Sequence, residues 1–404
     1  MSRRPIVATV AAVALATLIA ARGAPVPAKP PAIPVLVAET TSTGAFLDRD
    51  GFRLATPPYT FQFPIDHAAH PSFRSEWWYY TGHLRANERR FGYELTFFRI
   101  ALPTRGGGSG SAWRAQQVIF RHLALTDETG KKFRFDDRAN RQAMDLAGAD
   151  SSRYLVFLGD DYVGLEPDRT THRLVGSSPD FAIDLRLTPE RPPVIHGRDG
   201  VSQKSAGLGN ASHYYSLTRL ATRGRLTLGG DTLTVDGLSW MDHEFGSARL
   251  GSSHTGWDWF SVQLSDGSDL MLYRMRMVDG KLDTCSSGTM VGRDGRAHPL
   301  AVGDFDTRAV AQWVSPRTSG RYPGGWWEVS VPGDSLQLRF TPTVEDQELV
   351  AATMGGLAYW EGSVRVTGRH AGQIVTGQGY VELTGYVGPS PFQASWVDAF
   401  RDVH

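Results

Sequence analysis

Short runs of alternating apolar residues, separated by Gly, Asn and Asp, make up most of the chain after Pro57. Such runs are typical of antiparallel strands, in which successive side chains point to opposite faces of a sheet. A helical period is found at only one place, a short candidate around residues 138–146. The sequence therefore predicts an all-β fold of antiparallel barrels or sandwiches. The clearest strand runs are 77–84, 91–100, 117–125, 154–158 and 181–187.

Composition narrows the classes of function that this chain can have. With 404 residues, 41% of them hydrophobic, the chain can form two or three domains with sizeable cores. Its 42 basic and 42 acidic residues balance, which argues against nucleic acid as a partner. Cys285 is the single cysteine, so neither a disulfide within the chain nor a cysteine-based metal site can form.

Familiar catalytic motifs do not occur in the sequence. The segment 237–241 resembles the Gly-x-Ser-x-Gly elbow of hydrolases but has Met241 in place of the last glycine. The histidines form no tight pair, and His-Glu-x-x-His is missing. We therefore expect no serine triad, no metal and no cofactor.

The first 24 residues have the features of an export signal, because Arg3 and Arg4 precede an apolar run at 6–21 that ends among small residues. We expect a periplasmic or secreted protein. The run is short for a membrane span, which needs roughly 20 residues; an uncleaved signal would instead attach the protein to a membrane. Residues 25–56 are rich in Pro, Ala and Thr and are predicted to form a linker.

The rest of the chain contains an internal repeat. The aromatic run that begins at Trp77 and ends at Leu84 resembles the run from Trp257 to Leu264, and each is followed by a turn and a second strand. Two related β-domains in tandem are the simplest interpretation. We predict them at 57–248 and 249–390, with a tail at 391–404.

A second pair of similar segments closes each half, in which two adjacent aromatic residues precede a strand that begins with glycine. Aligning these segments matches Asp242 with Thr384 and Trp240 with Glu382. On this alignment the two halves differ chemically where they match structurally. We therefore expect a reactive site in one half or at the junction.

Asp242 carries the sharpest chemical signal in the sequence. Strand alternation would place Trp240 and Asp242 on one face, with Met241 and His243 on the other. A carboxyl group held among Trp240 and Tyr215 would be poorly solvated, so its pKa would rise and it could stay protonated near neutral pH. Such an acid could protonate an alkene, and the flanking rings would stabilise the carbocation that forms.

A structural role for Asp242 remains open at this point. Its carboxylate could cap a turn, or it could pair with Arg219 or Arg223 at the domain junction.

Glu76 and the aromatic pair that follows it have two interpretations as well. Of Trp77 and Trp78, strand geometry sends one ring into the core and the other towards a cavity, solvent or a neighbouring domain. A buried Glu76 must be paired or protonated. It could pair with Arg99 or Arg74, or it could recognise a polar group of a ligand.

Four segments together resemble one known family. They are SEWWYYTGHL at 75–84, YELTFFR at 93–99, WMDHEFG at 240–246 and GQGYVELTGY at 377–386. These segments are similar to the signature blocks of the AttH/CrtC-like family, which includes carotenoid 1,2-hydratase (hydroxyneurosporene synthase). The resemblance extends over about residues 57–390.

The resemblance implies two tandem lipocalin-like (calycin) antiparallel β-barrel domains that take an apolar isoprenoid or lipid. In the hydratase branch a catalytic Asp follows an aromatic residue by two positions, with another aromatic residue some 25 positions earlier. Here those places fall on Asp242, Trp240 and Tyr215. Residues expected to contact the ligand are His243, Tyr214, Glu76, Trp78 and Trp257.

Two functions from different classes follow. The first is an exported enzyme, like carotenoid 1,2-hydratase, in which Asp242 protonates a terminal carbon–carbon double bond and water completes the addition. The second is a lipid-binding or carrier protein of the cell envelope without turnover, which could work with an envelope transporter. A pericyclic or hydrolytic step in the same pocket is a third alternative.

Overall fold

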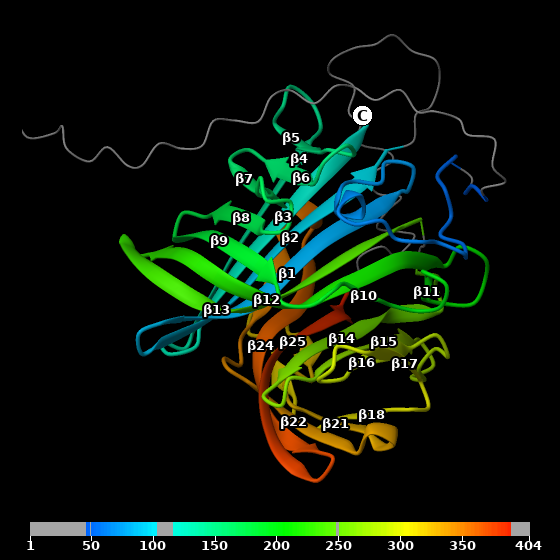
Figure 1. Ribbon diagram of the computed structural model, residues 1–404, viewed down its shortest axis with the longest axis vertical. Coiled ribbons are helices and arrows are strands. Elements are labelled where there is room, and N and C mark those ends of the chain that lie inside the picture. Colours follow the sequence, from blue (N-terminus) through cyan, green and yellow to red (C-terminus); the bar gives the residue numbers. More distant parts are fainter. Residues whose placement is uncertain (1–45, 49, 103–115, 248–249, 389–404) are drawn as a thin grey trace, which may run out of the picture. The chain divides into compact units, whose positions relative to one another are not determined.

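Strands account for nearly all regular structure in the computed structural model, which describes residues 46–48, 50–102, 116–247 and 250–388 (Figure 1). These ranges contain no α-helix, only three 3₁₀ turns. They are η1 (Ile65–His67), η2 (Pro332–Asp334) and η3 (Ala352–Met354). The predicted export signal, much of the predicted linker and the predicted tail lie outside the described residues. No helix within these ranges is long and apolar enough to cross a membrane.

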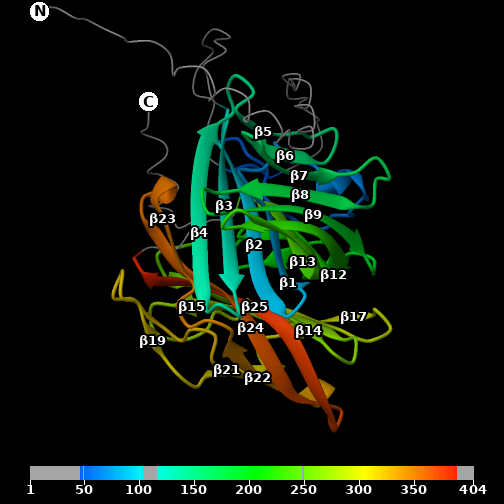
Figure 2. The ribbon, with the colours of Figure 1, turned by 90° about the vertical axis from the view of Figure 1, so that its left-hand side faces the viewer.

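The first sheet contains thirteen strands in the order β4-β3-β2-β1-β13-β12-β9-β8-β7-β6-β5, with β10 and β11 paired to β12. It curls into a nearly closed barrel, in which β5 and β6 approach β3 and β4 (Figure 2). Its strands are β1 (Ser75–Ala86), β2 (Arg89–Ala101), β3 (Gln117–Asp127), β4 (Lys132–Arg141), β5 (Ala147–Ala149), β6 (Leu155–Leu158), β7 (Asp161–Leu165), β8 (His172–Ser177), β9 (Phe181–Pro189), β10 (Val194–Ile195), β11 (Ser202–Gln203), β12 (Ala211–Leu228) and β13 (Asp231–Gly246).

The second sheet contains ten strands in the order β17-β16-β15-β14-β25-β24-β22-β21-β18, with β23 paired to β24, and forms a half-barrel. A separate hairpin consists of β19 (Trp313–Val314) and β20 (Arg321–Tyr322). The strands of the second sheet are β14 (His254–Leu264), β15 (Asp269–Met277), β16 (Ser287–Val291), β17 (Ala297–Ala301), β18 (Asp306–Ala309), β21 (Trp327–Val331), β22 (Leu336–Pro342), β23 (Glu348–Ala351), β24 (Leu357–His370) and β25 (Gln373–Val387).

The two sheets repeat one topology. The order β4-β3-β2-β1-β13-β12-β9 in the first corresponds strand for strand to β17-β16-β15-β14-β25-β24-β22 in the second. The two runs that begin at Trp77 and Trp257 form the equivalent strands β1 and β14. The prediction of an all-β fold with two tandem lipocalin-like barrel domains is confirmed.

Strand registers correct the alignment of the two halves. Tyr79 pairs with Asp242, and Trp259, the equivalent of Tyr79, pairs with Glu382. Glu382, not Thr384, is therefore the counterpart of Asp242. Because side chains alternate with a period of two, a two-residue shift leaves every residue on its predicted face and cannot be detected from the pattern. Both halves thus place an acid at this position.

The helix predicted around residues 138–146 is also wrong. β4 continues to Arg141, which pairs with Val118 of β3, and a turn follows. Most side chains of β4 are half-buried on both faces, so its sequence lacks the alternation that identifies a strand.

Both faces of β1 are buried, which explains its four consecutive aromatic residues. Trp78 and Tyr80 belong to the core inside the first barrel. Tyr79 points to the outer face and packs with Trp259 of the second sheet, their ring centroids 5.2 Å apart. The second sheet therefore covers the outer face of the first.

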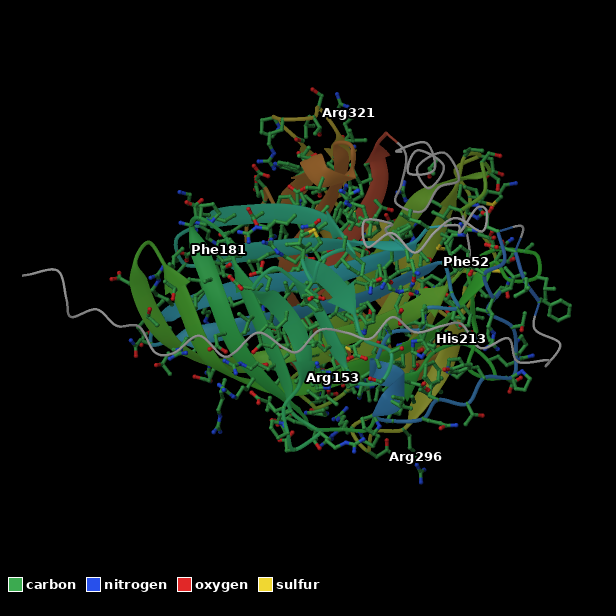
Figure 3. The ribbon with its side chains drawn as sticks, turned by 90° about the horizontal axis from the view of Figure 1, so that it is seen from above. Phe52, Arg153, Phe181, His213, Arg296 and Arg321 are labelled. Carbon is green, nitrogen blue, oxygen red and sulfur yellow. The ribbon has the colours of Figure 1, made fainter. Side chains whose placement is uncertain are left out.

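The segment before β1 packs on the same barrel. Tyr59 stacks on His213 of β12 with ring centroids 4.1 Å apart, and Phe73 contacts Phe245 of β13. Figure 3 labels Phe52 of this segment and His213 on the same side of the view. The segment thus covers aromatic residues that β12 and β13 would otherwise expose.

Candidate functional site

A cavity of about 120 Å³ lies between the outer face of the first sheet and the second sheet. β1, β2, β12 and β13 supply one wall, and β14, β15, β24 and β25 supply the other. Equivalent positions of the two halves face this space: Tyr79 and Trp259, Tyr214 and Tyr359, Asp242 and Glu382. The repeated fold therefore lines the cavity with matching rings and an acid from each half.

Asp242 is 4% exposed and accepts three hydrogen bonds. Tyr214 Oη donates to Asp242 Oδ2 at 2.6 Å, and Trp240 Nε1 donates to Oδ1 at 2.6 Å. Ser216 Oγ donates a short bond to the same Oδ1. Oδ2 has a single donor, so it is the oxygen with room for a proton.

The surroundings of Asp242 raise its pKa. Burial raises the pKa of this carboxyl to about 7, the neighbouring Glu244 adds to the rise, and the donors Ser216, Tyr214 and Trp240 oppose it. Neither arginine considered from the sequence is a partner of Asp242: Arg219 pairs with Asp269 instead, and Arg223 forms no ion pair with it. A buried acid without an arginine and with a pKa near neutrality is suited to proton transfer.

Behind Asp242, a chain of hydrogen bonds fixes Ser216. Thr289 Oγ1 lies 2.8 Å from His196 Nδ1, and His196 Nε2 lies 2.7 Å from Ser216 Oγ. Burial lowers the pKa of His196 to about 3, so the ring is neutral. Because the Ser216 hydroxyl donates to Asp242, His196 Nε2 is the protonated nitrogen and Nδ1 accepts from Thr289. These hydrogen bonds could not be predicted from the sequence, because His196, Ser216 and Thr289 are far apart along it.

Besides Asp242 and Glu244, three carboxyl groups face the cavity. Glu382 accepts from Trp257 Nε1 at 2.8 Å, Glu361 accepts from Tyr79 Oη at 2.6 Å, and Glu94 accepts from Thr96. Burial raises the pKa of Glu94 to about 7 and that of Glu382 to about 8. Burial, with Glu382 and Glu94 nearby, raises the pKa of Glu361 well above its ordinary value. The cavity is therefore rich in acids that can carry a proton at neutral pH.

Lys204 supplies the cationic group of the cavity. Its Nζ lies 3.0 Å from Glu244 Oε1, above the rings of Tyr214 at 4.8 Å and Tyr273 at 4.3 Å. Burial opposes its charge, but Glu244 and Tyr273 hold the pKa of Lys204 above its ordinary value. An ammonium group is thus stable here between a carboxylate and aromatic rings.

Tyr215 does not lie beside Asp242, contrary to the sequence-based expectation. Strand alternation turns it into the first barrel, where its hydroxyl lies 2.6 Å from His67 Nδ1 and 3.0 Å from His243 Nδ1. Its neighbour Tyr214 is the residue that reaches Asp242. The interpretation from spacing was thus off by one position, and one position reverses the face.

Of the five residues expected to contact the ligand, two line the cavity and three do not. Tyr214 and Trp257 face it. His243, Glu76 and Trp78 point into the first barrel, where Trp78 stacks on His243 with centroids 4.9 Å apart. All five residues lie on strands that border the cavity, but three of them are turned to the opposite face of their strand.

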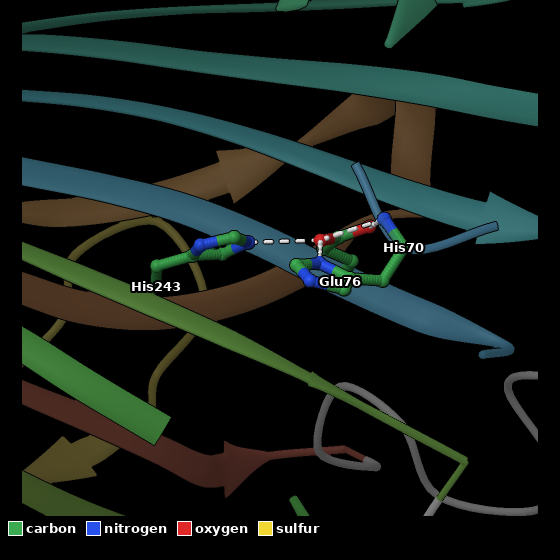
Figure 4. A group of neighbouring side chains, drawn as sticks. All are labelled: His70, Glu76 and His243. Atoms are coloured by element: carbon green, nitrogen blue, oxygen red, sulfur yellow. Dashed lines mark hydrogen bonds and ion pairs between the residues drawn. The ribbon is translucent and has the colours of Figure 1, made fainter. Parts of the chain in front are cut away.

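Inside the first barrel, Glu76 lies between His70 and His243 (Figure 4), and it also pairs with Arg99. Its Oε1 lies 2.8 Å from His70 Nδ1 and 2.8 Å from His243 Nε2, and its Oε2 accepts from Arg99 at 2.9 Å. Burial would raise the pKa of Glu76, but Arg99, His70 and His243 together lower it. The structure thus contains the ion pair between Glu76 and Arg99, which was one of the alternatives considered from the sequence.

His70, Glu76 and His243 are also the one group among the described residues with spacing suited to a metal ion. Each ligand atom already has a hydrogen-bond partner, and Arg99 places a positive charge beside the carboxylate. The donor set therefore fits a hydrogen-bonded ion-pair network better than a cation site.

This fold and site define a class: a lipocalin-like protein of two barrels with an acid-lined cavity between them. The chain belongs to the AttH-like family, whose model matches residues 54–386. A crystal structure from Nitrosomonas europaea, of a protein named as an AttH candidate, is 32% identical, with a TM-score of 0.75, and the match covers 83% of this chain and all of that one. Kievitone hydratase from Nectria haematococca has the same fold, with a TM-score of 0.62, 15% identity and coverage of 82% and 95%. No curated protein matches significantly.

Proposed function

We propose that this protein adds water to a carbon–carbon double bond, with Asp242 as the proton donor. The observation that carries the proposal is the environment of Asp242: a buried carboxyl in a ring-lined cavity, with a pKa raised to about 7 and no arginine partner in the part of the chain that the structure describes. At this pKa the group is a competent acid at neutral pH and its conjugate base is a competent acceptor.

The reaction would begin with transfer of the proton on Asp242 Oδ2 to the less substituted carbon of the alkene, whose π electrons form the new C–H bond. The carbocation left on the other carbon would lie among the electron-rich faces of Tyr214, Tyr79 and Trp259. A water molecule would then form the C–O bond and return one proton to the Asp242 carboxylate. The sum is alkene plus water to alcohol, with the acid regenerated.

The cavity volume restricts what can enter. About 120 Å³ is comparable to an engineered cavity that holds benzene, so a branched alkenyl end fits and a long isoprenoid does not fit whole. We therefore propose the end of an isoprenoid or lipid as the reacting group. Kievitone hydratase, a protein with this fold, is named for a hydration, which supports the reaction class as a proposal.

The setting of the reaction is part of the proposal. The apolar run near the N-terminus supports export to the periplasm or beyond, with membrane attachment if the signal is retained. An envelope transporter would be a natural source of an apolar substrate.

The test compares the wild type with Asp242→Asn and with a matched control, Asp236→Asn, on the same strand. Asp236 is exposed and pairs with Arg85 at the surface. Each protein is incubated with acyclic isoprenoids in ¹⁸O-labelled water, and the apolar extract is analysed by mass spectrometry. We expect a labelled hydrate from wild type and control, reduced by about 10² to 10⁴-fold in Asp242→Asn. Unchanged isoprenoid bound to all three proteins would overturn the hydration and leave a lipid carrier.

A further inference from the structure

Among the described residues, two carboxylate oxygens of the cavity lining have no hydrogen-bond partner: Glu94 Oε2 and Glu361 Oε2. Both side chains are 1% exposed and come from opposite sheets, Glu94 from β2 and Glu361 from β24. A buried polar atom without a partner costs roughly 1–3 kcal/mol, so such atoms in a cavity indicate a group that a ligand satisfies.

Glu382 of β25 adds a third carboxyl group to the cavity lining. Within the described ranges, no lysine or arginine forms an ion pair with Glu94, Glu361 or Glu382. The carboxyl groups act on one another, since Glu94 and Glu382 both raise the pKa of Glu361 and Glu94 also raises that of Glu382. A positive charge placed among them would satisfy all three.

The protein itself shows which cation this cavity accepts. In the lining of the same cavity, the Lys204 ammonium lies between the Glu244 carboxylate and the rings of Tyr214 and Tyr273. The three glutamates are likewise accompanied by aromatic rings, those of Trp257 and Tyr359, but no lysine ammonium pairs with them in the described residues.

We propose that the cavity binds a ligand through a protonated amine, held by Glu94 and Glu361 with Glu382 beside them. The inference refines the proposed function, because it names a second group that the alkene-bearing substrate carries. It rests on the proposed function only in that both concern the same cavity. An ammonium group has three N–H donors, enough for both unpartnered oxygens.

A metal ion fits this position less well. Among the described residues, the group with metal-ligand spacing is His70, Glu76 and His243, inside the first barrel, and none of the three cavity glutamates belongs to it. The three are therefore too widely spaced to share one small ion, whereas an ammonium reaches them through N–H bonds.

Calorimetry with two probes of matched shape tests the proposal. Benzylamine is protonated at pH 7, and benzyl alcohol replaces its ammonium with a neutral hydroxyl. We expect the full-length wild type to bind benzylamine about tenfold or more tighter than the alcohol, because charge-assisted hydrogen bonds and ring contacts act on the cation only. Titrations in phosphate and in Tris should also reveal proton release, since the ammonium converts protonated glutamates to carboxylates.

Variants assign the effect to the two glutamates. Glu94→Gln and Glu361→Gln should each weaken benzylamine about fivefold or more and leave the alcohol unchanged, while Glu166→Gln, which pairs with Arg186 outside the cavity, should bind like wild type. Circular dichroism confirms that each variant is folded. Equal affinities for the two probes, or benzylamine binding unaffected by both single variants, would overturn the proposal.

The design separates this inference from the proposed reaction. Asp242→Asn should retain its preference for benzylamine, because that side chain is outside the group of three glutamates. Amine binding without any hydration would contradict only the proposed function. Hydration of isoprenoids by a protein that does not prefer the amine would contradict only this inference.

Discussion

Tyr214 and Asp242 lie on adjacent strands and are joined by a hydrogen bond of 2.6 Å from Tyr214 Oη to Asp242 Oδ2. The same Oη accepts from Trp259 Nε1 of the second sheet at 3.1 Å. Because an indole N–H can only donate, the tyrosine proton is directed at the carboxylate. Trp259 of the second sheet therefore determines that Tyr214 is the donor in its hydrogen bond to Asp242 of the first sheet.

Tyr214→Phe should raise the pKa of Asp242, because it removes a donor that stabilises the carboxylate. A hydrogen bond to a charged group contributes roughly 1.5–3 kcal/mol, which corresponds to an upward pKa shift of about one to two units. Asp242 must be protonated to act as an acid. The high-pH limb of the kcat/KM profile for water addition should therefore move to higher pH. Tyr215→Phe, one residue away on the opposite face, is the control and should leave the limb in place. A profile that does not move in Tyr214→Phe would contradict the role given to this bond.

Thr289→Val should destabilise the fold although Thr289 is not in contact with Asp242. The substitution leaves the buried Nδ1 of His196 without its donor, at a cost of roughly 1–3 kcal/mol in the free energy of unfolding. Urea unfolding at pH 7 measures this loss. Thr232→Val, at an exposed threonine, should change stability far less. Equal stabilities for the two variants would show that the chain from Thr289 to Ser216 contributes nothing.

Most of the fold could be predicted from the sequence, because alternation and aromatic spacing determine strands and their repetition. The runs at 77–84 and 91–100 are β1 and β2, and the repeat of Trp77 at Trp257 is the repeat of the sheets. β4 was missed since both of its faces are half-buried, which removes the alternation on which strand prediction depends.

The site could be predicted only in part. Asp242 and Trp240 were identified together, and the structure joins them by a hydrogen bond. The acids of the facing wall could not be found, because a shift of two residues moved the alignment from Glu382 to Thr384 without changing any face. Tyr215 was chosen over Tyr214 since the spacing of two adjacent tyrosines does not say which one the neighbouring strand brings to the acid.

Glu94→Gln should remove a pH-dependent loss of stability. Burial raises the pKa of Glu94 in the fold from 4.5 to about 7, so its contribution is complete below 4.5 and is lost as pH rises through 7. The glutamine side chain is neutral throughout. The unfolding free energy of the wild type should therefore fall between pH 4.5 and 8 by roughly 1–3 kcal/mol more than that of the variant. Parallel curves from urea unfolding at pH 4.5, 6 and 8 would contradict a buried, protonated Glu94.

Glu76→Gln should have the opposite pH dependence. Arg99 and the two histidines outweigh burial and lower the pKa of Glu76, so its stabilisation is present above 4.5 and is lost as pH falls through the lowered value. At pH 7 the variant leaves the buried Arg99 unpaired, which should cost roughly 3–5 kcal/mol. Acid titration of the urea midpoint should be steeper for wild type than for the variant. Glu190→Gln, at an exposed position, is the control and should follow the wild type.

Gly92→Ala tests how tightly the two sheets pack beside the cavity. A Cβ at Gly92 of β2 would lie 2.6 Å from Tyr380 Oη and 2.7 Å from Ser363 Cβ, both on the second sheet. Such overpacking should lower the free energy of unfolding by roughly 1–3 kcal/mol. Gly303→Ala, where a Cβ meets no atom within 4 Å, should have little effect.

Adding Tyr380→Phe should recover part of that loss, because it removes the nearest atom in the clash while Ser363 still resists. In a double-mutant cycle the two substitutions should therefore couple by roughly 0.5–3 kcal/mol in the favourable direction, as residues in contact do. Urea unfolding of the wild type, both single variants and the double variant gives the coupling. If the losses in unfolding free energy of the two single variants simply add, Gly92 and Tyr380 do not touch. The second sheet would then cover the outer face of β2 less closely than the 2.6 Å between a Cβ at Gly92 and Tyr380 Oη requires.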